Sequence, residues 1–277
     1  MTLVMIWQES SPAGYIWVAS DSRLSGGNTV GSVRLTDRAT KILEIPVILR
    51  RQTALSVLGT PVKITNLGFV FTGSSLVALQ AYAAVLPLWS RLQSSGPEVL
   101  PSVRDFANHL AYFMQAFAGE IAFSQQGNIP KCQCALIGWS EPLTKLDGYL
   151  IEIEPTITPI STTVSQLEIF NSGSVQILGS GSNKARQELA TILGADGEAQ
   201  LRREPLKLIR QFINTSQHDE VGGGVQIGCA NPDGFQLFFD VQPVVYGTPF
   251  PDMRYHGFKF GEISRIGNVF VNLPGLT

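Results

Sequence analysis

The sequence has 277 residues, of which 44% are hydrophobic, enough for one large domain or two small ones with a substantial core. Only 15% of the residues are charged and the formal net charge is -2, so we expect neither a nucleic-acid partner nor binding to an anionic membrane surface. The low charge and the 27 glycines favour a β-rich protein that associates with copies of itself. A single large monomeric core would give nearly the same numbers.

The apolar runs and the cysteines predict a cytoplasmic protein. No run reaches the roughly 18 apolar residues that span a bilayer. The first run, Leu3–Ile6, has no basic region before it and predicts a strand rather than a signal peptide. The odd number of cysteines (Cys132, Cys134 and Cys229) indicates a reducing compartment. Because the sequence around Cys132 and Cys134 offers no further ligands, we expect buried structural thiols on one side of a strand, and neither a metal nor a cofactor.

The first half of the chain predicts strands followed by two helices. Two β-prone runs, 3–10 and 13–20, flank a short Pro/Gly loop and predict a hairpin. A buried strand should end at Gly73, Ser74 or Ser75 should cap a helix, and Pro87 should end or kink that helix. The remaining expected elements are a loop at 24–36, a strand at 41–46, a less certain strand around 54–57, a strand at 66–73, a helix at 75–86, a loop at 90–101 and a helix at 102–125.

The second half returns to strands, and the alternation of blocks predicts the fold class. The expected elements are strands at 132–138, 147–153 and 169–178, a turn at 146–148, helices at 183–193 and 204–216, and strands at 225–229 and 235–241 joined by a turn at 231–234. This order favours an α+β fold, a four-layer αββα sandwich of two sheets between two helix pairs. We assign residues 1–241 to that domain and treat 242–277 as a C-terminal extension, an interface arm or a lid.

Three polar residues at strand ends could converge at one end of a sheet. They are Thr2 before the first strand, Asp21 at the end of the second and Lys41 at the start of the third. A threonine hydroxyl needs a base, and once Met1 is removed the α-amine of Thr2 itself titrates near neutral pH. The Lys41 ammonium would hold the pKa of that amine down, and Asp21 would keep Lys41 charged and oriented.

The backbone N–H of Gly73, at a strand-to-helix turn, could donate to a developing oxyanion, with room for a substrate carbonyl beside it. Taken singly, each of these residues has an ordinary explanation. Asp21 could be a solvated loop residue, Lys41 a surface lysine and Gly73 a glycine at a helix start.

Six short motifs resemble, in order, the landmarks of proteasome β-type subunits and their bacterial relatives, which are N-terminal-nucleophile hydrolases. They are Thr2-Leu3-Val4, Ala19-Ser20-Asp21-Ser22-Arg23, Thr40-Lys41-Ile42, Phe71-Thr72-Gly73-Ser74, Gly179-Ser180-Gly181 and Asp219-x-x-Gly222-Gly223-Gly224. The resemblance covers roughly residues 2–240. It implies Thr2 as nucleophile with its amine as base, Lys41 as the lysine that tunes the amine, Asp21 as its partner and Gly73 as oxyanion donor.

The same resemblance implies further site residues. Ser180 and Asp219 would hydrogen-bond around the terminal amine, although Ser180 could equally be a helix N-cap and Asp219 a loop acid. The substrate pocket would be lined by Phe71, Leu24 and Ala39, and the large ring of Phe71 predicts a shallow pocket.

The sequence also departs from the pattern of that family. Gly222 stands where the family usually has serine, which removes a hydroxyl near the amine. The segment from Thr2 to Asp21 and the connection from Lys41 to Gly73 are both longer than usual, as is the C-terminal tail.

These observations together predict a cytoplasmic threonine-type endopeptidase, with copies assembled into a ring or spiral that encloses the sites and acts on peptides or unfolded proteins. Gly179-Ser180-Gly181 lacks the ending of a phosphate-binding loop, so any unfolding energy would come from a separate ATPase. Two alternatives stay open. One is a proteasome-like assembly protein that cleaves little or nothing, and the other is an amidase for a small molecule using the same nucleophile.

Overall fold

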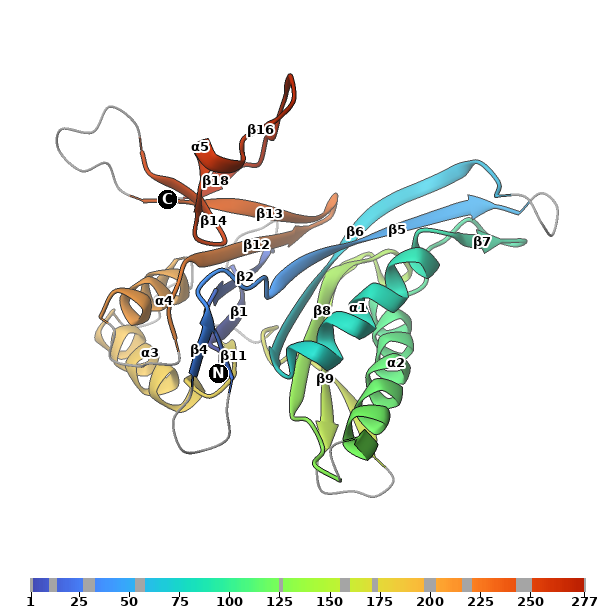
Figure 1. Ribbon diagram of the computed structural model, residues 1–277. Coiled ribbons are helices and arrows are strands. Elements are labelled where there is room, and N and C mark those ends of the chain that lie inside the picture. Colours follow the sequence, from blue (N-terminus) through green and yellow to red (C-terminus); the bar gives the residue numbers. More distant parts are fainter. Residues whose placement is uncertain are drawn as a thin grey trace.

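Two stacked β-sheets, each covered on its outer side by a pair of helices, form the four-layer α+β arrangement that the sequence predicts (Figure 1). The computed structural model describes residues 2–9, 14–26, 33–52, 58–124, 127–154, 160–170, 174–196, 203–215, 221–242 and 251–276. None of the helices in these ranges is long and apolar enough to cross a membrane.

The first sheet contains the N-terminal strand, second from one edge. Its main strands are β1 (Val4–Gln8), β2 (Ile16–Asp21), β11 (Val175–Leu178), β12 (Val225–Asn231) and β13 (Gly234–Val241), in the order β11-β1-β2-β12-β13. β1 and β2 form the predicted hairpin, in which Val4 lies opposite Ser20. The outer face packs against α3 (Ser182–Asp196) and α4 (Glu204–Thr215), with Met5 of β1 in the same buried cluster as Ile209 and Phe212 of α4.

The second sheet supplies the opposite layer. Its strands are β5 (Ile42–Arg51), β6 (Pro61–Gly73), β7 (Leu92–Ser94), β8 (Cys132–Ser140), β9 (Lys145–Glu154) and β10 (Ser161–Gln166), in the order β10-β9-β8-β6-β5-β7. Side chains along β6 alternate, so Phe69 and Phe71 face the helices while Val70 faces the first sheet. Burying a side chain such as Phe69 contributes roughly 1.5–3 kcal/mol.

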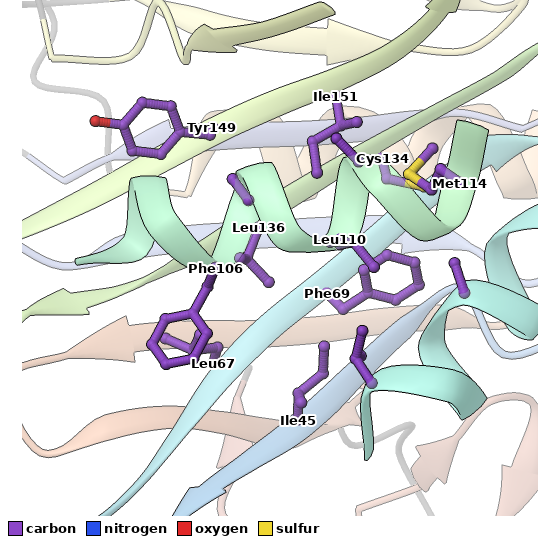
Figure 2. Close-up of a cluster of buried hydrophobic side chains, with 14 of the residues drawn as sticks. Ile45, Leu67, Phe69, Phe106, Leu110, Met114, Cys134, Leu136, Tyr149 and Ile151 are labelled. Atoms are coloured by element: carbon purple, nitrogen blue, oxygen red, sulfur yellow. The ribbon is translucent and has the colours of Figure 1, made fainter. Parts of the chain in front are cut away.

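Helices α1 (Ser75–Trp89) and α2 (Val103–Ser124) cover this second sheet. Figure 2 shows their shared core, in which Leu110 and Met114 of α2 lie over Phe69, Leu136 and Ile151 of the strands. Apolar residues of α2 recur at the predicted spacing of three and four, which places one continuous stripe against the sheet.

Helix α1 runs three residues beyond the predicted range of 75–86 and includes Pro87, where the sequence predicted an end or a kink. Pro87 lies in the last turn, so the helix loses the hydrogen bond to the carbonyl of Ala83 but keeps its earlier turns. Trp89 anchors that turn: its ring lies 4.7 Å from the ring of Phe106, and its indole N–H donates to Nδ1 of His109 at 3.0 Å. Ser74 caps the start of the helix as expected, accepting from the N–H of Val77.

Strands also occur where polar sequence predicted loops or turns. A hairpin of β3 (Leu24–Gly26) and β4 (Val33–Thr36) replaces part of the expected loop, and Leu146–Gly148 belongs to β9 instead of a turn. β10 was not predicted, and of the strand expected at 169–178 only β11 forms. Strand β7 and the short 3₁₀ helix η1 (Glu141–Leu143) form in segments for which the sequence predicts no regular structure. The less certain strand around 54–57 lies outside the described residues. β10 and β7 are the two edge strands of the second sheet, and β3 and β4 form a separate two-stranded sheet.

The C-terminal segment extends the first sheet. β14 (Met253–Tyr255) pairs antiparallel with β13, and β18 (Gly275–Leu276) pairs parallel with it. Between them lie β15 (Phe258–Lys259), α5 (Phe260–Ile263), β16 (Arg265–Ile266) and β17 (Val269–Phe270). Phe239 of β13 contacts the rings of Tyr255 and Phe260, so the segment is tied down by both ladders and apolar contacts.

His256 joins this C-terminal segment to the residues that precede Lys41. Its Nδ1 lies 3.0 Å from Oγ1 of Thr40, and its ring stacks on that of Tyr255. The residue is 4% exposed and has a positive φ of 52°, and burial lowers its pKa from 6.5 to about 4. Nearby, the guanidinium of Arg38 lies over the ring of Phe258.

We predict that the free energy of unfolding falls as the pH drops from about 6.5 to 4, and that His256→Asn removes part of this slope. In that range the unfolded chain binds a proton at His256 that the folded chain does not, so folding is disfavoured by up to about 3 kcal/mol at pH 4, and the loss then levels off. Asparagine tolerates positive φ, which makes it a matched replacement. Urea unfolding from pH 7.5 to 4 measures the effect, and parallel curves for the two proteins would contradict it.

Candidate active site

Thr2 lies at the edge of a cavity between the ends of the two sheets. The residue is 5% exposed and lies two residues before the start of β1. The cavity has a volume of about 600 Å³ and is lined by Thr2, Thr72, Gly73, Lys131, Cys132, Gln133, Glu152, Ile153, Gly179 and Ser180. The structure thus brings three of the predicted site residues, Thr2, Gly73 and Ser180, to one cavity.

Asp21 and Lys41 form a buried ion pair beside Thr2. The Lys41 ammonium lies 2.9 Å from Oδ1 of Asp21, and the two side chains are 1% and 0% exposed. The same oxygen accepts the backbone N–H of Leu3 at 3.0 Å. One carboxylate oxygen therefore contacts both the lysine and the residue that follows Thr2.

Backbone groups complete the surroundings of the Asp21 carboxylate. Its Oδ2 accepts the N–H of Arg23 at 3.1 Å and that of Gly222 at 3.2 Å. Three backbone donors and one ammonium thus stabilise the negative charge. Burial lowers the pKa of Lys41, while the charge of Asp21 and its hydrogen bond oppose that shift.

Gln226, which the sequence analysis missed, fixes the backbone on both sides of Lys41. Its Oε1 accepts the N–H of Lys41 at 2.8 Å and that of Ile42 at 3.2 Å. Its Nε2 donates to the carbonyls of Ala39 at 2.8 Å and Asp21 at 3.2 Å. The available signal was a glutamine near the start of β12, next to Val225 and Ile227.

The glycine at position 222 has a physical reason in this chain. A Cβ on Gly222 would lie 2.4 Å from Cζ of Arg23. That guanidinium is held by Asp37, with Nε 2.7 Å from Oδ1, and the hydrogen bond from Arg23 lowers the pKa of Asp37. Arg23 therefore occupies the space that a serine side chain at position 222 would need.

Two glycines shape the cavity through positive φ angles. Gly73 has φ 86°, and a Cβ there would lie 2.3 Å from the carbonyl oxygen of Lys131. Gly179 has φ 93°, and a Cβ there would lie 1.8 Å from the carbonyl oxygen of Thr2. Gly179 thus lets the backbone before α3 pack directly against the candidate nucleophile.

The other predicted site residues lie apart from this cavity or outside the described ranges. Phe71 is buried in the core that faces α1 and α2, and it does not line the cavity. Leu24 lies in β3, and Ala39 contributes a backbone carbonyl to Gln226. The predicted pocket of Phe71, Leu24 and Ala39 therefore differs from the cavity at Thr2. Asp219 lies outside the described residues.

A row of polar side chains crosses three strands on the cavity wall. Thr72, Gln133 and Glu152 are direct neighbours across β6, β8 and β9. The hydroxyl of Thr72 donates to Oε1 of Gln133, and Nε2 of Gln133 donates to Oε1 of Glu152. The sequence analysis missed Gln133 and Glu152, although Gln133 is a polar residue on a strand face that it shares with Ala135 and Ile137.

The cysteines are buried, as predicted. The sulfurs of Cys132 and Cys134 lie 3.7 Å apart, and burial raises the pKa of Cys134. Burial also raises the pKa of Cys229, to about 12. Such thiols stay protonated near neutral pH and are poor nucleophiles. No cluster of His, Cys, Asp and Glu suited to a metal ion occurs in the described part of the chain.

The fold is similar to solved structures even though no protein-family model and no curated protein matches the sequence significantly. The helical assembly of the Anbu complex from Pseudomonas aeruginosa has 15% identity and a TM-score of 0.54, over 90% of this chain and 88% of that one. Anbu (ancestral beta-subunit) from Yersinia bercovieri has 13% identity and a TM-score of 0.50, over 83% and 81%. A mutant of Anbu from Hyphomicrobium sp. strain MC1 has 10% identity and a TM-score of 0.50, over 86% and 84%. At these identities the likeness shows the fold, which agrees with the fold that the resemblance to proteasome β-type subunits implies.

We predict that Asp21→Asn destabilises the protein by about 3–5 kcal/mol, because it leaves the buried Lys41 ammonium without its counter-charge. Lys41→Met should cost less, since three backbone N–H groups still stabilise the Asp21 carboxylate. Urea unfolding at pH 7 measures both, with the partly exposed Asp37→Asn as a control of smaller effect. A larger loss of unfolding free energy in Lys41→Met than in Asp21→Asn would contradict this ranking.

We also predict that Gly179→Ala displaces Thr2 and costs more than the roughly 1–2 kcal/mol expected from the left-handed backbone alone. Gly181→Ala is the matched control, because the nearest atom to its Cβ is 3.6 Å away and it should be within about 0.5 kcal/mol of the parent. Thermal unfolding of both variants measures the difference, and equal stabilities would show that the close approach to Thr2 is easily relieved.

Proposed function

We propose that this protein is a threonine-type N-terminal-nucleophile hydrolase that cleaves peptide bonds with Thr2 after Met1 is removed. The observation that carries the proposal is the Oδ1 atom of Asp21. It joins the buried Lys41 ammonium to the N-H of Leu3, directly after Thr2 and beside a cavity. The likeness to Anbu structures supports this assignment at the level of the fold.

In the proposed mechanism, the free α-amine of Thr2 accepts the proton of the Thr2 hydroxyl, and the oxygen attacks the substrate carbonyl. The Lys41 cation disfavours the protonated form of a nearby amine, which keeps the base available near neutral pH. The N–H of Gly73 donates to the oxyanion, and Ser180 supplies a hydroxyl at the same cavity. The amine then passes its proton to the leaving amine, and water hydrolyses the resulting ester.

Self-association forms part of the proposal. The similar structure from Pseudomonas aeruginosa is described as a helical assembly of the Anbu complex. Large apolar side chains are exposed on several elements of this chain, including Tyr112 and Phe123 of α2 and Phe270 of β17. We infer that copies assemble into a ring or spiral around the sites, with peptides or unfolded chains as substrates.

A second candidate is a proteasome-like assembly protein with little or no hydrolysis. The near-complete burial of Thr2 and the glycine at position 222 both favour it over a small-molecule amidase. The two main candidates differ in whether a free Thr2 amine exists, because a chain that keeps Met1 has no such base.

We predict that the purified protein has the mass of the chain without Met1, and that a covalent threonine-directed inhibitor adds one equivalent at Thr2. Thr2→Ala should abolish both the adduct and peptide hydrolysis, because it removes the attacking oxygen while leaving the terminal amine in place. Thr60→Ala, at an exposed position between β5 and β6, is the control and should keep both. Intact-mass spectrometry gives the result, and full hydrolysis by Thr2→Ala would exclude the proposed mechanism.

A further inference from the structure

The cavity at Thr2 has a charged residue on its wall that the proposed chemistry does not use. Glu152 lies on β9, is partly buried, and faces the space between the two sheets. The alternation along β9 agrees with this direction. Leu150, two residues earlier, belongs to the core between the sheets, whereas the adjacent Ile151 and Ile153 belong to the core under the helices.

The Glu152 carboxylate has no cationic partner among the described residues. Nε2 of Gln133 donates a hydrogen bond to the carboxylate, and none of the ion pairs between described residues involves Glu152. Lys131 also lines the cavity, but it is exposed and lies one residue before β8, at the rim. Arg186 lines the adjoining cavity that Glu152 shares, and its guanidinium is bound to the carbonyl of Ile177 and to Asn183.

The hydrogen-bond row aims the carboxylate at the cavity. Thr72 donates to Gln133, whose carbonyl oxygen is thereby occupied, so the Gln133 amide is turned toward Glu152. One carboxylate oxygen of Glu152 accepts from that amide, and the negative charge of the carboxylate remains available to a ligand in the cavity. A carboxylate fixed in this way, in a part-buried site, favours a cationic ligand over a neutral or anionic one.

We propose that this cavity accepts a lysine or arginine side chain of the substrate and that Glu152 determines the preference. This inference rests on the proposed function of Thr2. Neighbouring strands lie about 4.8 Å apart, so β9 is about 10 Å from β6, where Gly73 would bind the reacting carbonyl. The long stem of a lysine or arginine, together with the Glu152 side chain, spans such a separation.

Other side chains fit the cavity less well. An acidic residue would meet the charge of Glu152, and a large apolar residue would take water from the carboxylate without replacing its hydrogen bonds. The cavity volume of about 600 Å³ is ample for an arginine side chain. Selectivity therefore comes from charge rather than from size.

Cleavage mapping tests this preference without assuming on which side of the scissile bond the basic residue binds. An unfolded protein is digested by the full-length enzyme, and the products are identified by mass spectrometry. We expect lysine and arginine to be enriched near the scissile bonds. In Glu152→Gln, whose amide oxygen still accepts from Gln133, hydrolysis of basic peptides should fall about tenfold or more relative to neutral ones.

Glu154→Gln is the matched control. It removes the same charge from the same strand two residues away, at a position that does not line the cavity. The control should keep the basic preference of the parent enzyme. An equal loss of the basic preference in both variants, or no change of preference in Glu152→Gln, would overturn the assignment of Glu152. The proposed function would still stand if hydrolysis depended on Thr2.

Binding to the Thr2→Ala protein gives a readout that needs no catalysis. Calorimetry with a lysine-containing peptide and its norleucine counterpart should show about tenfold or greater preference for lysine, reduced by salt and lost in Thr2→Ala/Glu152→Gln. Equal binding of the two peptides, or no binding of either, would overturn the inference whatever the activity of the parent enzyme. Conversely, a lysine preference in binding with no hydrolysis by the parent would overturn only the proposed function.

Discussion

The buried pair of Asp21 and Lys41 is the interaction on which the organisation of this protein depends. Removing two charges from water costs several kcal/mol for each ion, and their attraction offsets that cost only when further hydrogen bonds satisfy the remaining atoms. Here those bonds come from the backbone at Leu3, Arg23 and Gly222. The requirement for these donors fixes how the start of β1, the end of β2 and the approach to β12 meet.

The same requirement explains residues that otherwise look unrelated. Gln226 holds the backbone around Lys41 through three hydrogen bonds and binds the carbonyl of Asp21 through a fourth, so the backbones of both members of the pair are fixed by one side chain. Gly222 brings an N–H to the carboxylate and leaves room for Arg23, whose charge is in turn neutralised by Asp37. The cavity at Thr2 therefore lies beside a polar centre in which each buried group is held by several others.

The sequence predicts much of the fold and of the candidate site, for reasons that particular residues illustrate. The period of α2, the capping Ser74 and the β-prone runs of β1 and β2 are local signals, and they identify the layers. Thr2, Gly73 and Ser180 follow from short motifs at element ends. Gln133, Glu152 and Gln226 were missed because their roles depend on which strands lie side by side. β3, β4 and β10 were missed because their sequences are polar, and α1 runs on to Trp89, whose contacts with Phe106 and His109 of a second helix lie outside any local signal.

The dependence of Asp21 and Lys41 on β12 has a consequence for the order in which the protein is made. The ribosome completes Asp21 and Lys41 early, but the amide of Gln226 and the N–H of Gly222 emerge some two hundred residues later. Because domains fold as units from chains that emerge gradually, the polar centre cannot be completed on a partial chain. A nascent or truncated polypeptide thus carries Thr2, Asp21 and Lys41 without the hydrogen bonds from Gln226 and Gly222 that surround the ion pair in the complete chain.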